Sequence, residues 1–209
     1  MVIAVVASLM SAGTISYFSD EEKAEGTFTA GTIDIELDPD TAQTVMVDGR
    51  PDLKPCEVGW INLTVKNVGT NPLELWKHIE NVTNWENDIN DPEGEYYEMN
   101  PESEFFNLSD YVHYDIYIND TEYISESEGF VLTDNMSTSW IGVECKWIYI
   151  GVLQPGEWIW INQSYHINYT VDNWAQTDMI TFDMVFLALQ VEGAIPPEPA
   201  PVLPGYGRP

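Results

Sequence analysis

Seven asparagines in this chain stand in the Asn-x-Ser/Thr pattern, the acceptor sequence for N-linked glycans, and none has proline in the middle position. With 14 Asn and 26 Ser or Thr among 209 residues, random placement predicts only about one or two such sequences. The expected chemistry is transfer of a sugar to the side-chain amide, on exposed segments outside the cytosol. The predicted acceptors are Asn62, Asn81, Asn107, Asn119, Asn135, Asn162 and Asn168.

The densest group of oxygen ligands lies between residues 86 and 95, where carboxylates and amides alternate around a glycine. Hard cations such as Ca²⁺ bind several oxygens of this kind, although the spacing here departs from the EF-hand pattern. Two interpretations stay open, a calcium-binding loop and a solvated acidic loop. The candidate ligands are Asp88, Asn90, Asp91, Glu93 and Glu95.

Cys56 and Cys145 are the two cysteines of the chain. In an oxidising compartment an even number of cysteines favours a disulfide, and closing a loop of this length contributes roughly 4 to 5 kcal/mol in the chain-entropy model. The alternative is two buried, reduced cysteines that pack as small apolar side chains. We predict a disulfide between Cys56 and Cys145.

Few residues are suited to catalysis. The histidines are His78, His113 and His166, and the sequence has no His-Glu-x-x-His segment, Gly-x-Ser-x-Gly turn or phosphate-binding glycine loop. Paired carboxylates could serve a glycosidase, but 35 acidic residues bring some pair together in any fold. The sequence therefore predicts a protein that is not an enzyme.

The charge of the chain restricts its partners. Asp and Glu number 35 against seven Lys and Arg, giving a formal charge of -28, which excludes attraction to nucleic acid phosphates and anionic membranes. Identical copies also repel one another, so assembly needs screening salt, bound cations or deep burial at the contact. With 44% hydrophobic residues and eight Trp, the chain still has enough apolar surface to fold as one domain.

The N-terminal segment indicates export. Residues 2–10 are almost entirely apolar and small residues follow at 11–13, as in the hydrophobic region and cleavage site of a secretory signal. The run is short for a membrane span, so we expect none in the mature form. Residues 1–16 are either this removed signal or a retained segment buried in a neighbouring molecule.

Short alternating segments predict an all-β fold. Many strands without a long amphipathic helix favour a two-sheet sandwich over residues 31–193. Residues 102–110 are expected to form a short helix, and the proline-rich residues 194–209 a tail that cannot join a sheet. The predicted strands are 32–37, 44–47, 60–66, 73–79, 113–118, 129–132, 140–150, 158–169 and 179–191.

One short pattern occurs twice, one hundred residues apart. Trp60, Ile61 and Asn62 recur as Trp160, Ile161 and Asn162, each time a few residues after a proline turn. Both convergent turn chemistry and duplication of a unit explain such a repeat.

Several motifs occur in an order found in one family. They are an aromatic-x-Asp start at residues 18–20, TFTAGTIDIEL at 27–37, LKPCE at 53–57 and VKNVGT at 65–70. This order resembles the TasA/camelysin family of secreted fibre-forming proteins, and residues 180–190 resemble its last strand. Cys56 stands where the family usually has glycine. Some relatives have been labelled metallopeptidases, but we find no matching ligand set.

The resemblance implies a jelly-roll sandwich whose subunits join by donor-strand exchange, in which the N-terminal segment of one copy completes the sandwich of the next. Residues 17–30 are then the donor strand or linker. The candidate donor side chains are Val2, Ile3, Val5, Val6, Leu9, Tyr17, Phe18 and Phe28.

We therefore expect a structural subunit of an extracellular filament or pilus at the cell surface, with identical subunits as partners and a role such as biofilm matrix. Glycans on such a protein fit an archaeal surface. Two alternatives remain: a type IV pilin-like subunit with a helical N-terminus, and a monomeric surface carbohydrate-binding module or glycosidase.

Overall fold

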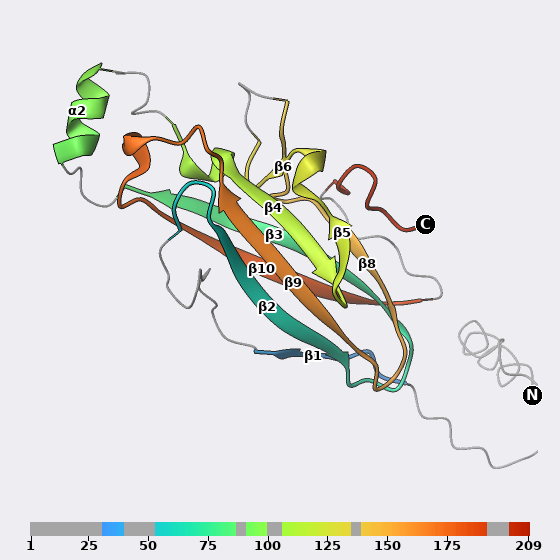
Figure 1. Ribbon diagram of the computed structural model, residues 1–209. Coiled ribbons are helices and arrows are strands. Elements are labelled where there is room, and N and C mark those ends of the chain that lie inside the picture. The colour runs from blue at the N-terminus through green and yellow to red at the C-terminus, as the bar shows by residue number, and fades with distance from the viewer. Residues whose placement is uncertain (1–30, 40–52, 87–90, 100–105, 135–138, 192–200) are drawn as a thin grey trace, which may run out of the picture. The chain divides into compact units, whose positions relative to one another are not determined.

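The computed structural model describes residues 31–39, 53–86, 91–99, 106–134, 139–191 and 201–209, and these form two β-sheets (Figure 1). The larger sheet has the order β1-β2-β9-β4-β6-β7, with β5 paired to β4. Its strands are β1 Ile35–Asp38, β2 Val58–Asn67, β4 Val112–Ile118, β5 Thr121–Ile124, β6 Phe130–Val131, β7 Ile141–Gly142 and β9 Trp158–Ile167.

The smaller sheet has the order β10-β3-β8. Its strands are β3 Leu73–Trp85, β8 Ile148–Leu153 and β10 Met179–Gln190. Helical segments are short: the α-helix α2 Asp91–Met99 and the 3₁₀ turns η2 Leu108–Tyr111, η3 Glu126–Glu128 and η4 Asn173–Ala175.

The two sheets enclose one hydrophobic core, which confirms the predicted β-sandwich. Buried side chains from both sheets, such as Val65 and Ile161 in the larger and Leu75 and Ile148 in the smaller, belong to a single cluster. The pairing is nested, because β2 pairs with β9 and β3 pairs with β8, so early strands lie beside late ones as in a jelly roll. Every pair of named strands is antiparallel except β6 and β7, which are parallel.

Alternation along β2 and β9 explains why these strands form the middle of the larger sheet. In β2, Ile61, Leu63 and Val65 are buried while the residues between them face outward. In β9, Ile159 and Ile161 point into the core, and Trp158 and Trp160 are exposed. Successive side chains of a strand point to opposite faces, so one face of each strand packs on the core and the other meets solvent.

The predicted strands match most of the observed ones, with differences that have local causes. The expected strand 140–150 is wrong as one element, because a turn at residues 143–146 separates β7 from β8. Cys145 has a φ of 56° in that turn, a left-handed backbone that breaks the regular run of a strand. The strand β5 and the helix α2 were not predicted. Of the expected helix 102–110, the described part forms only the 3₁₀ turn η2, and the expected strand 44–47 lies outside the described residues.

Candidate functional site

The long strand β10 forms one edge of the smaller sheet. It pairs with β3 from Met179 to Gln190, and among the described residues no strand pairs with its other side. An open edge of this length presents a row of backbone N–H and C=O groups that another strand can pair with. This side of the sandwich is therefore a candidate docking edge for an additional strand.

The side chains of β10 are incompletely covered. Those of one face pack against the core but remain partly exposed, namely Ile180, Phe182, Met184, Phe186 and Ala188. In contrast, the core-facing side chains Leu73, Leu75 and Ile79 of the neighbouring strand β3 are fully buried. Among the described residues, the core-facing side chains of the smaller sheet are thus fully covered at β3 and partly exposed at β10.

At the opposite edge of the smaller sheet, another segment of the chain covers the start of β8. We call residues 201–209 the C-terminal strap. Its backbone runs beside β8, where Trp147 N–H donates to Pro201 C=O at 2.9 Å, Leu203 N–H to Trp147 C=O at 2.8 Å, and Tyr149 N–H to Tyr206 C=O at 2.9 Å. These bonds lie at Tyr149 of β8 and at Trp147 just before the strand.

Side chains hold the C-terminal strap in place. Leu203 is fully buried in the common core, and the Arg208 guanidinium lies 2.6 Å from the buried carboxylate of Glu74. The expectation that residues 194–209 form a tail unable to join a sheet is therefore wrong for residues 201–209. Proline lacks an N–H but keeps its C=O, and Pro201 uses that C=O to accept a ladder bond.

Leu203→Ala is expected to loosen the C-terminal strap. Truncating a fully buried leucine usually lowers the free energy of unfolding by about 2 to 5 kcal/mol, and the lower end applies where the segment can detach. Amide hydrogen exchange should show faster exchange of the Trp147 and Tyr149 N–H groups, while the β2–β9 amides keep their protection. Unchanged exchange at Trp147 and Tyr149 would contradict this role of Leu203. The matched control is Val202→Ala, since Val202 lies beside Leu203 but is exposed.

The predicted glycan acceptors differ in their surroundings. Asn62 on β2, Asn81 on β3, Asn107 before η2 and Asn119 after β4 are exposed, and Asn162 on β9 is half-buried. Asn81 Nδ2 donates to Asp183 at 2.8 Å. Asn168 is 9% exposed, and its Nδ2 lies 2.9 Å from His113 Nε2. Asn135 lies outside the described residues.

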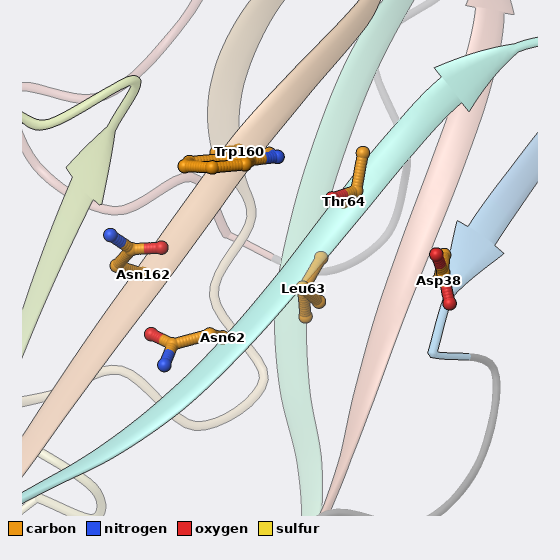
Figure 2. Close-up of a pocket in the computed structure, with 6 residues that line it drawn as sticks. All are labelled: Asp38, Asn62, Leu63, Thr64, Trp160 and Asn162. Atoms are coloured by element: carbon orange, nitrogen blue, oxygen red, sulfur yellow. The ribbon is translucent and has the colours of Figure 1, made fainter.

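A shallow hollow lies on the outer face of the larger sheet, around two of these acceptors. It has a volume of about 360 Å³ and is lined by Asp38, Asn62, Leu63, Thr64, Trp160 and Asn162 (Figure 2). Asn62 and Asn162 are direct cross-strand partners in the β2–β9 register. The sequence repeat that contains them is therefore brought together in space.

The two cysteines do not form the predicted disulfide, because both thiols are free and exposed. Cys56 N–H donates to Ile167 C=O of β9, in the larger sheet, whereas Cys145 N–H donates to Ile79 C=O of β3, in the smaller one. The alternative of two buried thiols is wrong as well. Cys145 is exposed, but the protein atoms around it partly desolvate its thiol, which raises the pKa of the thiol, and the Glu144 and Glu80 carboxylates raise it further.

Both cysteines occupy the position of tight turns that normally needs glycine. Cys56 has a φ of 67° and Cys145 a φ of 56°. Each is the third residue of a turn closed by a backbone bond, from Glu57 N–H to Lys54 C=O and from Lys146 N–H to Val143 C=O. In the turn 154–157 the same position is taken by a glycine, with a φ of 79°.

The calcium candidates are only partly described. Asp88 and Asn90 lie outside the described residues, whereas Asp91, Glu93 and Glu95 belong to helix α2. Glu95 is exposed. The calcium site therefore stays a prediction. The candidate donor residues between Val2 and Phe28 also lie outside the described part of the chain.

A buried lysine that the sequence analysis did not single out lies in the core. Lys77 is fully buried, and its Nζ donates to Tyr114 Oη at 2.7 Å, which in turn donates to Gln163 Oε1 at 2.9 Å. Burial lowers the pKa of the Lys77 ammonium from 10.5 to about 7. The sequence itself indicates this burial, because Lys77 falls in the alternating series Leu73, Leu75, Lys77 and Ile79, whose members share the core-facing side of β3.

The three histidines do not gather around one point. His78 stacks on Trp147 with ring centroids 4.0 Å apart, on the outer side of the smaller sheet. His113 and His166 are cross-strand partners on β4 and β9, with stacked rings 4.9 Å apart. Within the parts of the chain that the structure describes, no group of three or more His, Cys, Asp or Glu side chains is arranged to hold a metal ion.

Comparison with known proteins places this geometry in context. A family model described as camelysin metallo-endopeptidase matches residues 1–194, and no curated protein matches the chain significantly. A catalytic zinc needs three protein ligands and an open position, and the described residues do not supply that set. None of the described helices is long and apolar enough to cross a membrane.

Proposed function

The chain belongs to the camelysin family, which includes the secreted, fibre-forming TasA proteins, and from this premise we propose that it is a structural subunit of an extracellular filament. Subunits join when a strand of one copy pairs with the open edge of β10 in the next. The observation that carries this proposal is the difference between the two edges of the smaller sheet. At the β8 edge the C-terminal strap bonds to Trp147 and Tyr149, at the start of the strand, while the edge at β10 has no partner strand among the described residues.

The half-exposed face of β10 supplies a driving force for this assembly. Phe182, Met184 and Phe186 are partly buried side chains that an added strand would cover. Complete burial of a large apolar side chain contributes roughly 1.5 to 3 kcal/mol before the entropy of ordering is subtracted. The added strand also forms hydrogen bonds with the free backbone N–H and C=O groups of the edge. It therefore covers the apolar side chains and satisfies the backbone polar groups at the same time.

The N-terminal segment is the proposed donor. It offers apolar residues at Val2 to Leu9 and aromatic residues at Tyr17, Phe18 and Phe28, which suit a half-open core. Each subunit has a formal charge of -28, so identical subunits repel one another and a contact confined to the surface is weak. A donor segment that is buried in the core of the next subunit can outweigh this repulsion. Bound Ca²⁺ would reduce the same repulsion. The role that fits such a fibre is biofilm matrix or attachment at the cell surface.

The family name raises the possibility of a peptidase. The residues described do not provide a zinc ligand set, so we derive no proteolytic step. A structural subunit is distinguished from a peptidase by incubating the purified chain with unfolded casein, with and without added zinc. No peptide release in either condition is expected from a structural subunit.

Electron microscopy of the purified full chain tests the filament proposal. Long, regular filaments are expected, and a reconstruction at a resolution that separates strands should show a strand from the adjacent subunit beside β10. Dispersed particles at all salt and Ca²⁺ concentrations would overturn assembly. Filaments in which the β10 edge remains unpaired would overturn donor-strand exchange while leaving the structural role intact.

A further inference from the structure

The repeated Trp-Ile-Asn segment forms a local two-fold arrangement on the outer face of the larger sheet. Asn62 lies opposite Asn162 in the antiparallel register. The same register places Trp60 opposite Ser164 and Thr64 opposite Trp160. The hydroxyl residue of each acceptor sequence therefore faces the tryptophan of the other strand. We call Asn62 and Asn162 the asparagine pair.

Each member of the asparagine pair follows a tryptophan on its own strand by two residues. Residues two apart in a strand share a face, so Trp60 and Asn62 are neighbours on β2. Trp160 and Asn162 are likewise neighbours on β9 (Figure 2). Both indoles are open to solvent, since Trp60 is 39% and Trp160 49% exposed. Exposed indoles beside acceptor amides are poorly explained by core packing alone.

A third acceptor repeats this spacing next to the pair. Tyr117 precedes Asn119 by two residues, and its ring lies 5.7 Å from that of Trp60. Asn119 N–H donates to Trp160 C=O at 3.0 Å, which fixes this turn against β9. Three acceptor sequences with an aromatic residue at the same offset therefore converge on one face.

We propose that Asn62 and Asn162 both carry N-linked glycans, and that the first sugar of each glycan packs on the tryptophan two residues before it. A pyranose has an apolar C–H face, which covers an aromatic ring and removes both surfaces from water. The shallow hollow of about 360 Å³ beside Trp160 and Asn162 leaves space for a sugar ring on this face. This inference does not depend on the filament proposal.

The antiparallel geometry allows both asparagines to be modified. Directly opposed residues have Cβ atoms only about 4.5 to 5.5 Å apart, so two glycans rising straight from the sheet would collide. Each glycan instead extends toward the tryptophan of its own strand. Because β2 and β9 run in opposite directions, Trp60 and Trp160 lie on opposite sides of the asparagine pair, and the glycans diverge.

The modification step needs a lipid-phosphate-linked oligosaccharide as sugar donor and a membrane transferase. The asparagine Nδ2 attacks the anomeric carbon of the first sugar, the bond from that carbon to the phosphate oxygen breaks, and the lipid phosphate leaves with the bonding electrons. Nδ2 loses one proton to a base of the transferase and becomes a glycosylated amide. No oxidant or reductant takes part.

Asn168 is the internal counterexample. It is 9% exposed, its Oδ1 accepts from Thr170 N–H at 3.0 Å and from Thr170 Oγ1 at 2.8 Å, and its Nδ2 lies 2.9 Å from His113 Nε2. A glycan on Nδ2 would replace the contact with His113 and would have no room beside it. We expect Asn168 to be unmodified although its acceptor sequence is complete.

Glycopeptide mass spectrometry of the full chain, isolated from the cells that produce it, tests the assignment. Sugars are expected on the peptides that contain Asn62 and Asn162, and none on the peptide that contains Asn168. An unmodified Asn62 or Asn162 would overturn the paired arrangement, whether or not other acceptors carry sugar. Modification of Asn168 in the folded chain would overturn the argument from burial.

A double-substitution experiment tests the packing on tryptophan. Asn62→Gln, which removes one glycan, is expected to lower the Tm by about 2 to 4 °C, the shift that corresponds to roughly 1 kcal/mol in a domain of this size. In a Trp60→Ala background, Asn62→Gln should lower the Tm by much less, because the indole that the sugar packs on is already absent. Trp158→Ala is the matched control, since Trp158 is 52% exposed on the same face but four residues before Asn162. Equal losses in all backgrounds would overturn packing of the sugar on Trp60.

A second experiment distinguishes a covalently attached glycan from a binding site for free carbohydrate. The chain made in cells that lack N-glycosylation is titrated with oligosaccharides, and its tryptophan fluorescence is recorded. No saturable change is expected, because the proposed contact depends on the covalent link at Asn62. Saturable binding of free sugar, together with unmodified asparagines in the native chain, would replace the proposal by a carbohydrate-binding surface.

Discussion

Removal of residues 1–28 is expected to abolish filament formation and to leave soluble monomers. The proposed donor is lost, while the described β-sandwich, which begins after it, keeps its core of side chains from both sheets. Without a donor the edge of β10 stays unpaired and the formal charge of the subunits keeps them apart. Sedimentation velocity and electron microscopy of the full chain and the deletion variant, at matched salt, measure the change.

A peptide with the sequence of residues 1–28 provides the control. If the deleted segment acts as a strand donor, the peptide should bind the deletion variant and raise its Tm in a saturable manner, without restoring filaments. A shuffled peptide of the same composition should not bind. Polymerisation of the deletion variant at the rate of the full chain would contradict N-terminal exchange.

Lys77→Met is expected to stabilise the monomer near neutral pH. The Lys77 ammonium titrates near pH 10.5 in the unfolded chain but near 7 in the folded one. Between these values the unfolded chain therefore binds a proton that the folded chain lacks, and stability rises with pH by about 1.4 kcal/mol per unit. The loss of folding stability that results from burying this amine is largest at and below pH 7 and decreases as the pH rises. Methionine has no ionisable group and removes this loss.

The pH dependence distinguishes this effect from simple repacking. The advantage of Lys77→Met over the parent chain should shrink by about 2 kcal/mol from pH 7 to pH 9, because the slope is smaller than 1.4 kcal/mol per unit next to the folded-state pKa. Urea unfolding of monomers at each pH measures this change. Burial also raises the pKa of the nearby Tyr114 hydroxyl, so the comparison ends at pH 9, before tyrosines of the unfolded chain ionise. Lys66→Met, at an exposed position of β2, is the control. An advantage independent of pH would contradict the depressed pKa.

Much of the sandwich could be predicted because period-two alternation is a local property. β2 and the first half of β9 alternate between buried and outward-facing residues, so their positions follow from Ile61, Leu63, Ile159 and Ile161 alone. Their partnership, however, depends on register across one hundred residues, and only the structure shows that Asn62 faces Asn162. The repeat had been interpreted as turn chemistry or duplication, and neither interpretation includes direct pairing.

The features that were missed depend on tertiary context. Composition marks residues 194–209 as extended and unable to form a ladder, yet Leu203 finds a pocket in the core and carries the backbone to β8. Likewise, Cys145 interrupts an apolar run that predicts one continuous strand, because its N–H bonds to Ile79 and its backbone turns left-handed. Neither the burial of Leu203 nor the turn at Cys145 produces a periodic pattern in the sequence.

The proposed assembly also determines how many neighbours a subunit has. If each subunit accepts one strand at the β10 edge and donates one N-terminal segment, it has a valence of two, and the filament grows linearly without branches. Such a filament is polar, and its two ends differ chemically, because one presents an unpaired β10 edge and the other an N-terminal segment that has not been inserted. A protein that binds only one of these ends would therefore control filament length without binding along its sides.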